Sequence, residues 1–215
     1  MKQKITCFCE NAFEVDISDE INLDDGKSLA EILDGSFLTF KCPSCGKKHK
    51  PEFPIYLVWP SKKVKFEVFR ELDRGEFYRR KKLPSDRFFT DNNFCSLETI
   101  ISFPELAERL AILNDGFDPA AIEAIKYYLH VKAEEQYPDN ELTIYYYSSD
   151  SAKESLEFHI HGIREGEVAV MKISSALYKQ TLDDYKRNPK SELFSSLRVN
   201  SYLSVKNTMR PEQFR

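Results

Sequence analysis

Two pairs of cysteines constrain this chain more than any other feature. The first pair lies in Cys7-Phe8-Cys9, and the second lies in Cys42-Pro43-Ser44-Cys45-Gly46. Thiolates this close together can bind one ion, and Zn²⁺ takes four such sulfurs in a tetrahedron. Glycine after the second pair favours a tight turn, because it adopts positive φ without strain. The spacing therefore predicts a structural Zn²⁺ site formed by Cys7, Cys9, Cys42 and Cys45.

Other interpretations of the cysteines stay open from the sequence. Cys7 and Cys9 are one residue closer than is usual for a zinc-binding pair, so they could be ordinary strand residues. Cys42 and Cys45 could form a redox dithiol, but such pairs usually open a helix that lowers the thiolate pKa. The residues that follow Cys45 do not have a helical pattern. His49 is near enough to replace one cysteine as a metal ligand.

The chain resembles the CpXC domain family of bacterial and archaeal proteins, which is named for paired Cys-Pro-x-Cys motifs. The resemblance implies a zinc-ribbon-like metal-binding module and no particular activity, because the family is functionally uncharacterised. The first motif departs from the family pattern, since it lacks the proline and one residue. The resemblance covers about residues 1–130 and rests on four stretches, 5–9, 33–46, 54–63 and 113–126.

The charge of the chain is unevenly distributed. The net charge is −4 over 215 residues, which disfavours a uniformly basic nucleic-acid binder. Residues 61–90 hold 10 basic and 5 acidic groups, and residues 186–215 hold 7 basic and 2 acidic groups. Residues 91–185, by contrast, hold 7 basic and 18 acidic groups. The basic loop 74–87 and the C-terminal tail could contact phosphates. The candidate nucleic-acid contacts in that loop are Arg79, Arg80, Lys81 and Lys82.

The hydrophobic pattern of the first half is strand-like. Hydrophobic and polar residues alternate up to Ile17, which predicts a strand. A short helix is expected over 28–33, with Ser28 as N-cap and Gly35 just after its end. The hydrophobic residues in 71–96 recur at no regular spacing, which indicates a linker or loop. Further strands are predicted over 37–40, 55–59 and 64–69, the last two forming a hairpin.

The pattern of the second half predicts helices followed by an antiparallel sheet. Helices are expected to begin near Pro104 and after Asp118, since proline suits the first helical turn. Three strands are then expected, over 142–148, 156–163 and 167–173. They are followed by a helix capped by Ser174. The tail over 197–205 could form a further strand or lie loose.

These patterns predict an α+β fold in three parts. A zinc-ribbon-like β module covers 1–70, a basic linker covers 71–96, and an α+β domain with an antiparallel sheet and a basic tail covers 97–215. Length alone allows one large domain or two small ones. Three consecutive tyrosines, 145–147, must face both sides of a sheet, so one side is expected to present tyrosine to a partner.

Two weaker patterns are candidates for chemistry. Glu157, His159 and His161 share one face of a predicted strand, because strand side chains alternate. These are metal-ligand types, but a solvent-facing polar strand has the same pattern. Cys95 stands alone among apolar residues, and we interpret it as a buried structural thiol, because no histidine signature accompanies it.

The sequence gives catalysis no positive support. It contains no Walker loop, no Rossmann glycine pattern, no G-x-S-x-G elbow and no H-E-x-x-H. No run approaches the roughly 18 apolar residues of a membrane helix, and early acidic residues disfavour a signal peptide, so we expect a cytoplasmic protein. The expected function is a non-catalytic zinc protein that binds a protein partner or itself. The alternative is a nucleic-acid-associated factor that uses the basic loop and tail.

Overall fold

The structure is a computed structural model that describes residues 2–18, 20–79 and 96–209. It divides into two compact units, Met1–Ala107 and Glu108–Arg215, and the division falls inside helix α3 (Phe103–Asn114). Each unit mixes helices and strands, which confirms the predicted α+β class. Among the described residues, no helix is both long enough and apolar enough to cross a membrane.

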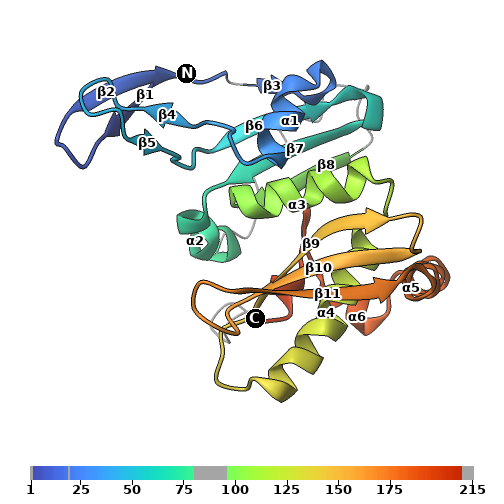
Figure 1. Ribbon diagram of the computed structural model, residues 1–215. Coiled ribbons are helices and arrows are strands. Elements are labelled where there is room, and N and C mark those ends of the chain that lie inside the picture. Colours follow the sequence, from blue (N-terminus) through green and yellow to red (C-terminus); the bar gives the residue numbers. More distant parts are fainter. Residues whose placement is uncertain (1, 19, 80–95, 210–215) are drawn as a thin grey trace. The chain divides into compact units, whose positions relative to one another are not determined.

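Two short hairpins of the first unit lie side by side (Figure 1) and bring the cysteine pairs together. In each hairpin the two strands pair antiparallel, and the turn between them contains one cysteine pair. The hairpins are small, because the second has only two residues in each strand. Their strands are β1 (Lys2–Thr6) with β2 (Ala12–Asp16), and β4 (Phe40–Lys41) with β5 (Lys48–His49).

The rest of the first unit is built on a mixed sheet. Its strands lie in the order β8-β7-β6-β3, with β6 and β7 antiparallel and the two outer pairs parallel. Side chains from the central strands, such as Leu57 and Phe66, are fully buried. The predicted hairpin over 55–69 is confirmed. The strands are β3 (Glu20–Asn22), β6 (Ile55–Trp59), β7 (Val64–Phe69) and β8 (Ser96–Ile101).

The structure corrects the expected position of the first helix cap. Helix α1 covers Lys27–Leu33 and begins one residue earlier than predicted, with Gly26 at its N-cap. The Asp25 side chain accepts from the backbone N–H of Ser28, so Asp25 takes the role expected of Ser28. Gly35 has a φ of 76° and donates its N–H to the Ile32 carbonyl, which confirms the predicted left-handed residue after the helix.

Part of the segment expected to lack structure is helical. A 3-10 turn, η3 (Glu71–Asp73), leads into helix α2 (Arg74–Arg79), in which Phe77 is buried. Ser96 begins β8, which pairs with β7 and therefore belongs to the sheet of the first unit. The sequence instead assigns residues from 97 onwards to the second domain. Which segments fold independently stays a prediction.

The second unit packs a long helix against a three-stranded antiparallel sheet (Figure 1). The strand order is β11-β10-β9, and both pairs are antiparallel, which confirms the predicted antiparallel sheet. Asp118 and Ser174 both cap helices through their side chains, at 2.8 and 3.1 Å from the N–H groups of Ala120 and Ala176. The elements are α4 (Pro119–Gln136), β9 (Thr143–Asp150), β10 (Ser155–His161), β11 (Val168–Ser174), α5 (Ser175–Arg187) and α6 (Glu192–Ser196).

The segment after α6 is ordered and packed. It forms a small hairpin of β12 (Arg198–Val199) and β13 (Tyr202–Leu203), followed by the turn η5 (Val205–Asn207). Leu203 and Val205 pack against Ala120 and Ala124 of α4. The sequence left open whether residues 197–205 form a strand or lie loose. The structure shows two short strands in this segment, packed against the second unit.

Candidate metal centre

The first cysteine pair lies in the turn between β1 and β2. The Cys7 N–H donates to the Asn11 carbonyl, and the Glu10 N–H donates to the Cys7 carbonyl, both at 2.9 Å. Glu10 has a φ of 67°, a left-handed conformation that costs a non-glycine residue roughly 1–2 kcal/mol. The turn is thus closed by a glutamate in a conformation that normally favours glycine.

The second cysteine pair lies in the turn between β4 and β5. The Cys42 N–H donates to the Lys47 carbonyl, and the Gly46 N–H donates to the Cys42 carbonyl, both at 2.9 Å. Gly46 has a φ of 72°, which confirms the predicted role of this glycine. The two turns therefore have the same plan, in which a left-handed residue follows the second cysteine.

The two turns place all four cysteine sulfurs next to one another. The Cys7 and Cys45 sulfurs are 3.5 Å apart, the Cys9 and Cys42 sulfurs are 3.7 Å apart, and all four lie within 4.8 Å. Four sulfurs at about 2.3 Å from one zinc ion would be about 3.8 Å apart, from the geometry of a tetrahedron. The four donor atoms therefore fit a single tetrahedral ion and could hold it.

The cysteine group is half covered by protein. Cys7 and Cys42 are buried, whereas Cys9 and Cys45 are exposed. Each pair thus supplies one inner and one outer sulfur. Thiolate donors suit zinc, copper(I) and iron–sulfur centres, so the residues fit a metal ion. When bound, such an ion would supply a covalent-like link between the two hairpins.

Two polar side chains contact the cysteine sulfurs from outside. His49 Nε2 lies 3.1 Å from the Cys7 sulfur, and the Asn11 amide donates to the Cys42 sulfur at 3.7 Å. His49 therefore lies within hydrogen-bonding distance of one of the four candidate ligands. Asn11 was not predicted as part of the site, because a single asparagine two residues after a cysteine carries no recognisable signal.

The thiol groups differ in acidity. Hydrogen bonding from the Cys9 backbone lowers the pKa of Cys7, but burial and the sulfurs of Cys45, Cys9 and Cys42 outweigh this and raise it to about 12. Burial raises the pKa of Cys42, but the N–H groups of Cys45 and Ser44 and the sulfurs of Cys7 and Cys9 together outweigh it and lower this pKa to about 6. The second turn therefore directs backbone dipoles at a sulfur and favours its thiolate form.

A comparison with protein families matches the sequence to a known group. The model described as "CpXC protein" matches residues 5–126, which is more than half of the chain and includes all four cysteines. The chain belongs to the CpXC family. The resemblance identified in the sequence is thereby confirmed.

One relative extends the similarity beyond the CpXC motifs. An uncharacterised protein of Treponema pallidum (strain Nichols) is 28% identical over 217 residues, covering 95% of this chain and 97% of the relative. The similarity therefore includes both units of the CpXC protein. No solved structure matches the chain.

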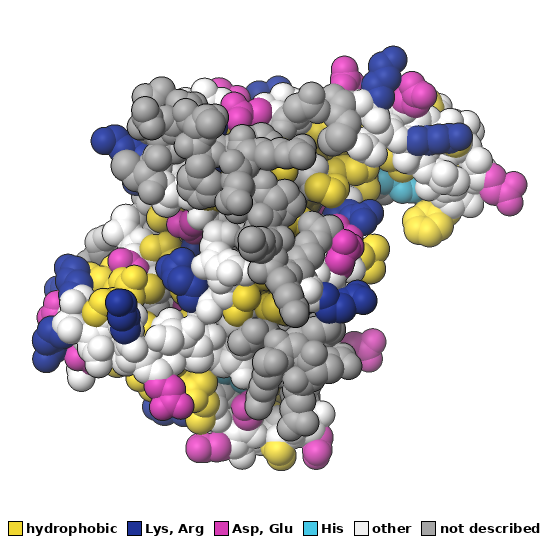
Figure 2. Space-filling model, turned by 180° about the vertical axis from the view of Figure 1, so that it is seen from behind, with side chains coloured by type: hydrophobic (Ala, Val, Ile, Leu, Met, Phe, Trp, Pro, Cys, Tyr) yellow, Lys and Arg dark blue, Asp and Glu magenta, His cyan; other side chains and the backbone are white. Residues whose placement is uncertain are grey.

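The other cysteine and the basic run of this CpXC protein lie mostly outside the described residues. Cys95, Arg80, Lys81 and Lys82 fall in the stretch between 79 and 96. Arg79 ends α2, is exposed, and donates to the Gly75 carbonyl at 3.1 Å. Figure 2 shows basic and acidic side chains interspersed on the face it presents. The nucleic-acid contacts therefore stay a prediction.

The histidine-bearing strand of the CpXC protein forms polar contacts of its own. Glu157 accepts from His159 at 3.1 Å and pairs with Lys172 at 3.2 Å, and these two contacts lower its pKa. His159 stacks on Tyr147 with ring centroids 3.9 Å apart. In the described part of the chain, the cluster that could hold a metal consists of the four cysteines and does not include this strand.

Proposed function

We propose that this protein is a non-catalytic interaction protein whose N-terminal module is held together by one structural Zn²⁺ ion. The observation that carries the proposal is the grouping of four cysteine sulfurs within 4.8 Å. Two short hairpins bury little apolar surface by themselves, and modules of this size usually need a metal ion to stay folded. The ion would join β1–β2 to β4–β5 and so stabilise both turns.

The first turn supports a role in binding protein. Phe8 lies between two of the cysteines and is 87% exposed. Its ring stacks on His49 with centroids 5.8 Å apart, so it is held in place while facing water. A fixed, exposed aromatic ring next to a rigid backbone is the kind of anchor that protein interfaces use. Metal binding would keep this anchor preorganised.

The open edge of the three-stranded sheet supports self-association. Strand β11 is an edge strand within the described part of the second unit. Its seven residues include one charged side chain, Lys172, and its outer face presents Val168 and Val170, which are 45% and 55% exposed. Long edge strands with few charges tend to pair with another strand. An antiparallel pair of β11 strands centred on Met171 would extend the sheet between two copies.

The metal content of the purified protein tests the zinc proposal. Elemental analysis by mass spectrometry is expected to find one zinc per chain in the wild type. Cys9→Ser and Cys42→Ser should each lose the metal, whereas Cys95→Ser, the matched control, should keep it. Equal zinc in all four proteins, or none in the wild type after purification without chelators, would contradict the proposal.

The nucleic-acid alternative makes a different prediction. A factor that binds through Arg79 to Lys82 must lose affinity steeply with salt, because binding phosphates releases counterions. Filter binding of single-stranded oligonucleotides between 50 and 300 mM salt distinguishes the two functions. The interaction proposal expects weak binding at every salt concentration.

A further inference from the structure

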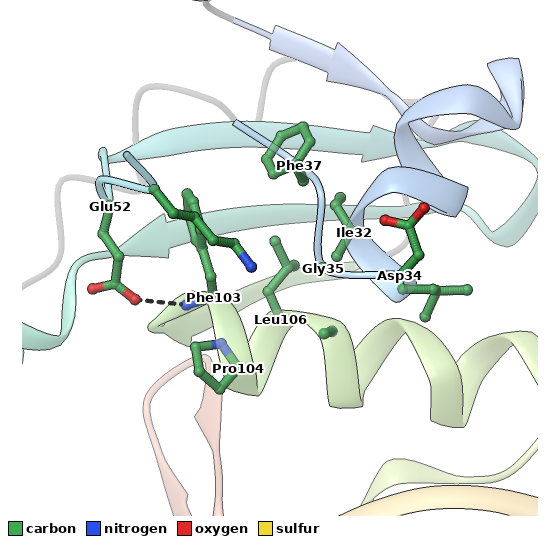
Figure 3. A pocket seen from close by; sticks show the side chains of 11 residues that line it. Ile32, Asp34, Gly35, Phe37, Glu52, Phe103, Pro104 and Leu106 are labelled. Carbon is green, nitrogen blue, oxygen red and sulfur yellow. Dashed lines mark hydrogen bonds between the residues drawn. The ribbon is translucent and has the colours of Figure 1, made fainter. Parts of the chain in front are cut away.

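A pocket in the first unit lies apart from the cysteine group. It has a volume of about 360 Å³, within the range of sites for small molecules. Helix α1 and the residues that follow it form one side, and the first turn of α3 forms the other (Figure 3). The lining residues are Ile32, Leu33, Asp34, Gly35, Phe37, Lys50, Glu52, Phe103, Pro104, Leu106 and Ala107.

The lining is mainly apolar where the two sides meet. Ile32, Phe37, Phe103 and Leu106 are all buried, and Leu106 is fully so. The rings of Phe37 and Phe103 are in contact, with centroids 5.8 Å apart. This packed lining is preformed, so a ligand with an apolar body can bind without the cost of ordering the lining side chains.

The two carboxylates of the pocket are already engaged. Glu52 accepts from the Phe103 N–H at 2.9 Å and from the Glu71 N–H at 2.7 Å, one with each oxygen. The first of these bonds is visible in Figure 3. It also places the negative charge of Glu52 at the positive N-terminus of α3. Asp34 accepts from the Ser36 N–H at 2.8 Å. Both carboxylates therefore accept from backbone N–H groups, and each keeps its negative charge at the pocket.

Lys50 is the polar group of the pocket that is still available. A Cβ added to Gly35 would lie 3.4 Å from its ammonium nitrogen, so the lysine lies across the end of α1. Within the described ranges, this ammonium has no hydrogen bond and no ion pair, although its charge helps to lower the pKa of Asp34. An ammonium at the rim of an apolar pocket favours a ligand that ends in an anion.

The backbone around Lys50 is held on both sides. His49 pairs with Phe40 in the hairpin that carries the second cysteine pair. Two residues after the lysine, Glu52 is fixed by its two backbone hydrogen bonds. The backbone position of the lysine at the pocket is therefore set by the fold.

We propose that this pocket binds a small monocarboxylic acid with an apolar body, whose carboxylate pairs with Lys50. The apolar body would lie between α1 and α3 against the accessible surfaces of Leu33 and Pro104. A neutral ligand would forgo the ion pair, and a cationic ligand would face the ammonium directly. The proposal goes beyond the metal site and does not depend on which metal the cysteines hold.

Titration with three compounds of equal chain length tests the proposal on the full-length protein. Octanoate, 1-octanol and octylammonium are added separately, and the methyl NMR signals of Ile32 and Leu106 report on binding. We expect octanoate to shift these signals at millimolar concentration and to bind at least fivefold more tightly than the other two. Equal binding of octanoate and octanol, or no shift with octanoate, would overturn the proposal.

Two lysine variants separate the pocket from general surface charge. Lys50→Met should weaken octanoate binding about fivefold, which is the upper end for an ion pair open to water, and leave octanol binding unchanged. Lys48→Met removes an exposed lysine two residues earlier and should have no effect. Equal affinity in wild type and Lys50→Met would contradict the assigned role. Shifts confined to residues outside the pocket would show that octanoate binds elsewhere and would also overturn the proposal.

Discussion

His49 Nε2 lies 3.1 Å from the Cys7 sulfur, one of the two buried sulfurs in a group of four that could itself complete a tetrahedron. The histidine is carried by β5, which follows the second cysteine pair, whereas Cys7 belongs to the first pair. The contact therefore joins the two hairpins independently of any ion. We expect the four sulfurs to be the ligands and His49 to act as a hydrogen-bonding neighbour of Cys7.

The variant His49→Phe tests this assignment. Phenylalanine keeps a ring that can stack on Phe8 but removes the nitrogen next to Cys7. We expect one zinc per chain, with an affinity about tenfold lower, because groups that hydrogen-bond to a metal ligand typically contribute that much. Competition with a chromophoric chelator measures the change. Complete loss of zinc would instead make His49 a ligand.

A second prediction concerns the buried charges of the second unit. Lys126 pairs with Glu108 at 2.7 Å and with Glu123 at 3.2 Å. Lys126→Met would leave both carboxylates buried without this partner, which typically costs 3–5 kcal/mol. Urea unfolding should show a loss of about 3 kcal/mol. Lys132→Met, on the exposed side of the same helix, should change stability by less than about 0.5 kcal/mol. Similar effects of the two variants would contradict the prediction.

Two buried charges, Glu123 of α4 and Arg109 of α3, hold the C-terminal segment in place. Glu123 accepts from the Val205 N–H at 2.7 Å, and Arg109 donates to the Leu203 carbonyl at 2.7 Å. The sequence left open whether the tail forms a strand or lies loose. These contacts explain why it is packed against the second unit. The sequence could not predict them, because they join residues 82 and 94 positions apart.

A third prediction concerns pH. Burial raises the pKa of Glu108 to about 7, from an ordinary 4.5. Between these two values the folded protein holds more protons than the unfolded protein at this group, so its contribution to stability falls as the pH rises from about 5 to 7. Glu108→Gln keeps an oxygen that can accept from the Tyr146 N–H and should flatten this dependence. Thermal unfolding of both proteins across that range measures the difference, and parallel curves would contradict it.

A fourth prediction uses the expected register of two β11 strands. In an antiparallel pair centred on Met171, Val170 of one copy faces Lys172 of the other. Val170→Lys should therefore weaken self-association by placing like charges opposite each other, and Val170→Glu should preserve or strengthen it. Sedimentation at 10–300 μM measures the effect.

The control for this prediction is Val131→Lys, which makes the same change on α4 at a residue that is 38% exposed. It should sediment like the wild type. A wild type that is monomeric at every concentration, or equal effects of the two lysine variants, would contradict pairing through β11.

Local chemistry made several elements predictable from the sequence. Asp118 and Ser174 cap helices as expected, and Gly46 adopts positive φ after the second cysteine pair. Each of these features depends on neighbours within a few residues. The four cysteines were also predictable as a group, because chelation leaves few other uses for two close pairs in one chain.

Elements that depend on distant contacts were not predictable. Helix α2 has six residues and buries one apolar side chain, Phe77, so it leaves no periodic pattern. Strand β8 joins the first sheet by parallel pairing with β7, which no local signal specifies. Glu10 takes the left-handed conformation that Gly46 takes in the other turn. A glutamate in the sequence does not predict this conformation, whereas a glycine does.

X-ray absorption at the zinc edge tests the central claim most directly, because it measures the atoms bound to the metal in solution. The account predicts a single shell of four sulfur atoms at about 2.3 Å, unchanged in the His49→Phe variant. A first shell that contains nitrogen or oxygen atoms in place of any of the four sulfurs would contradict it.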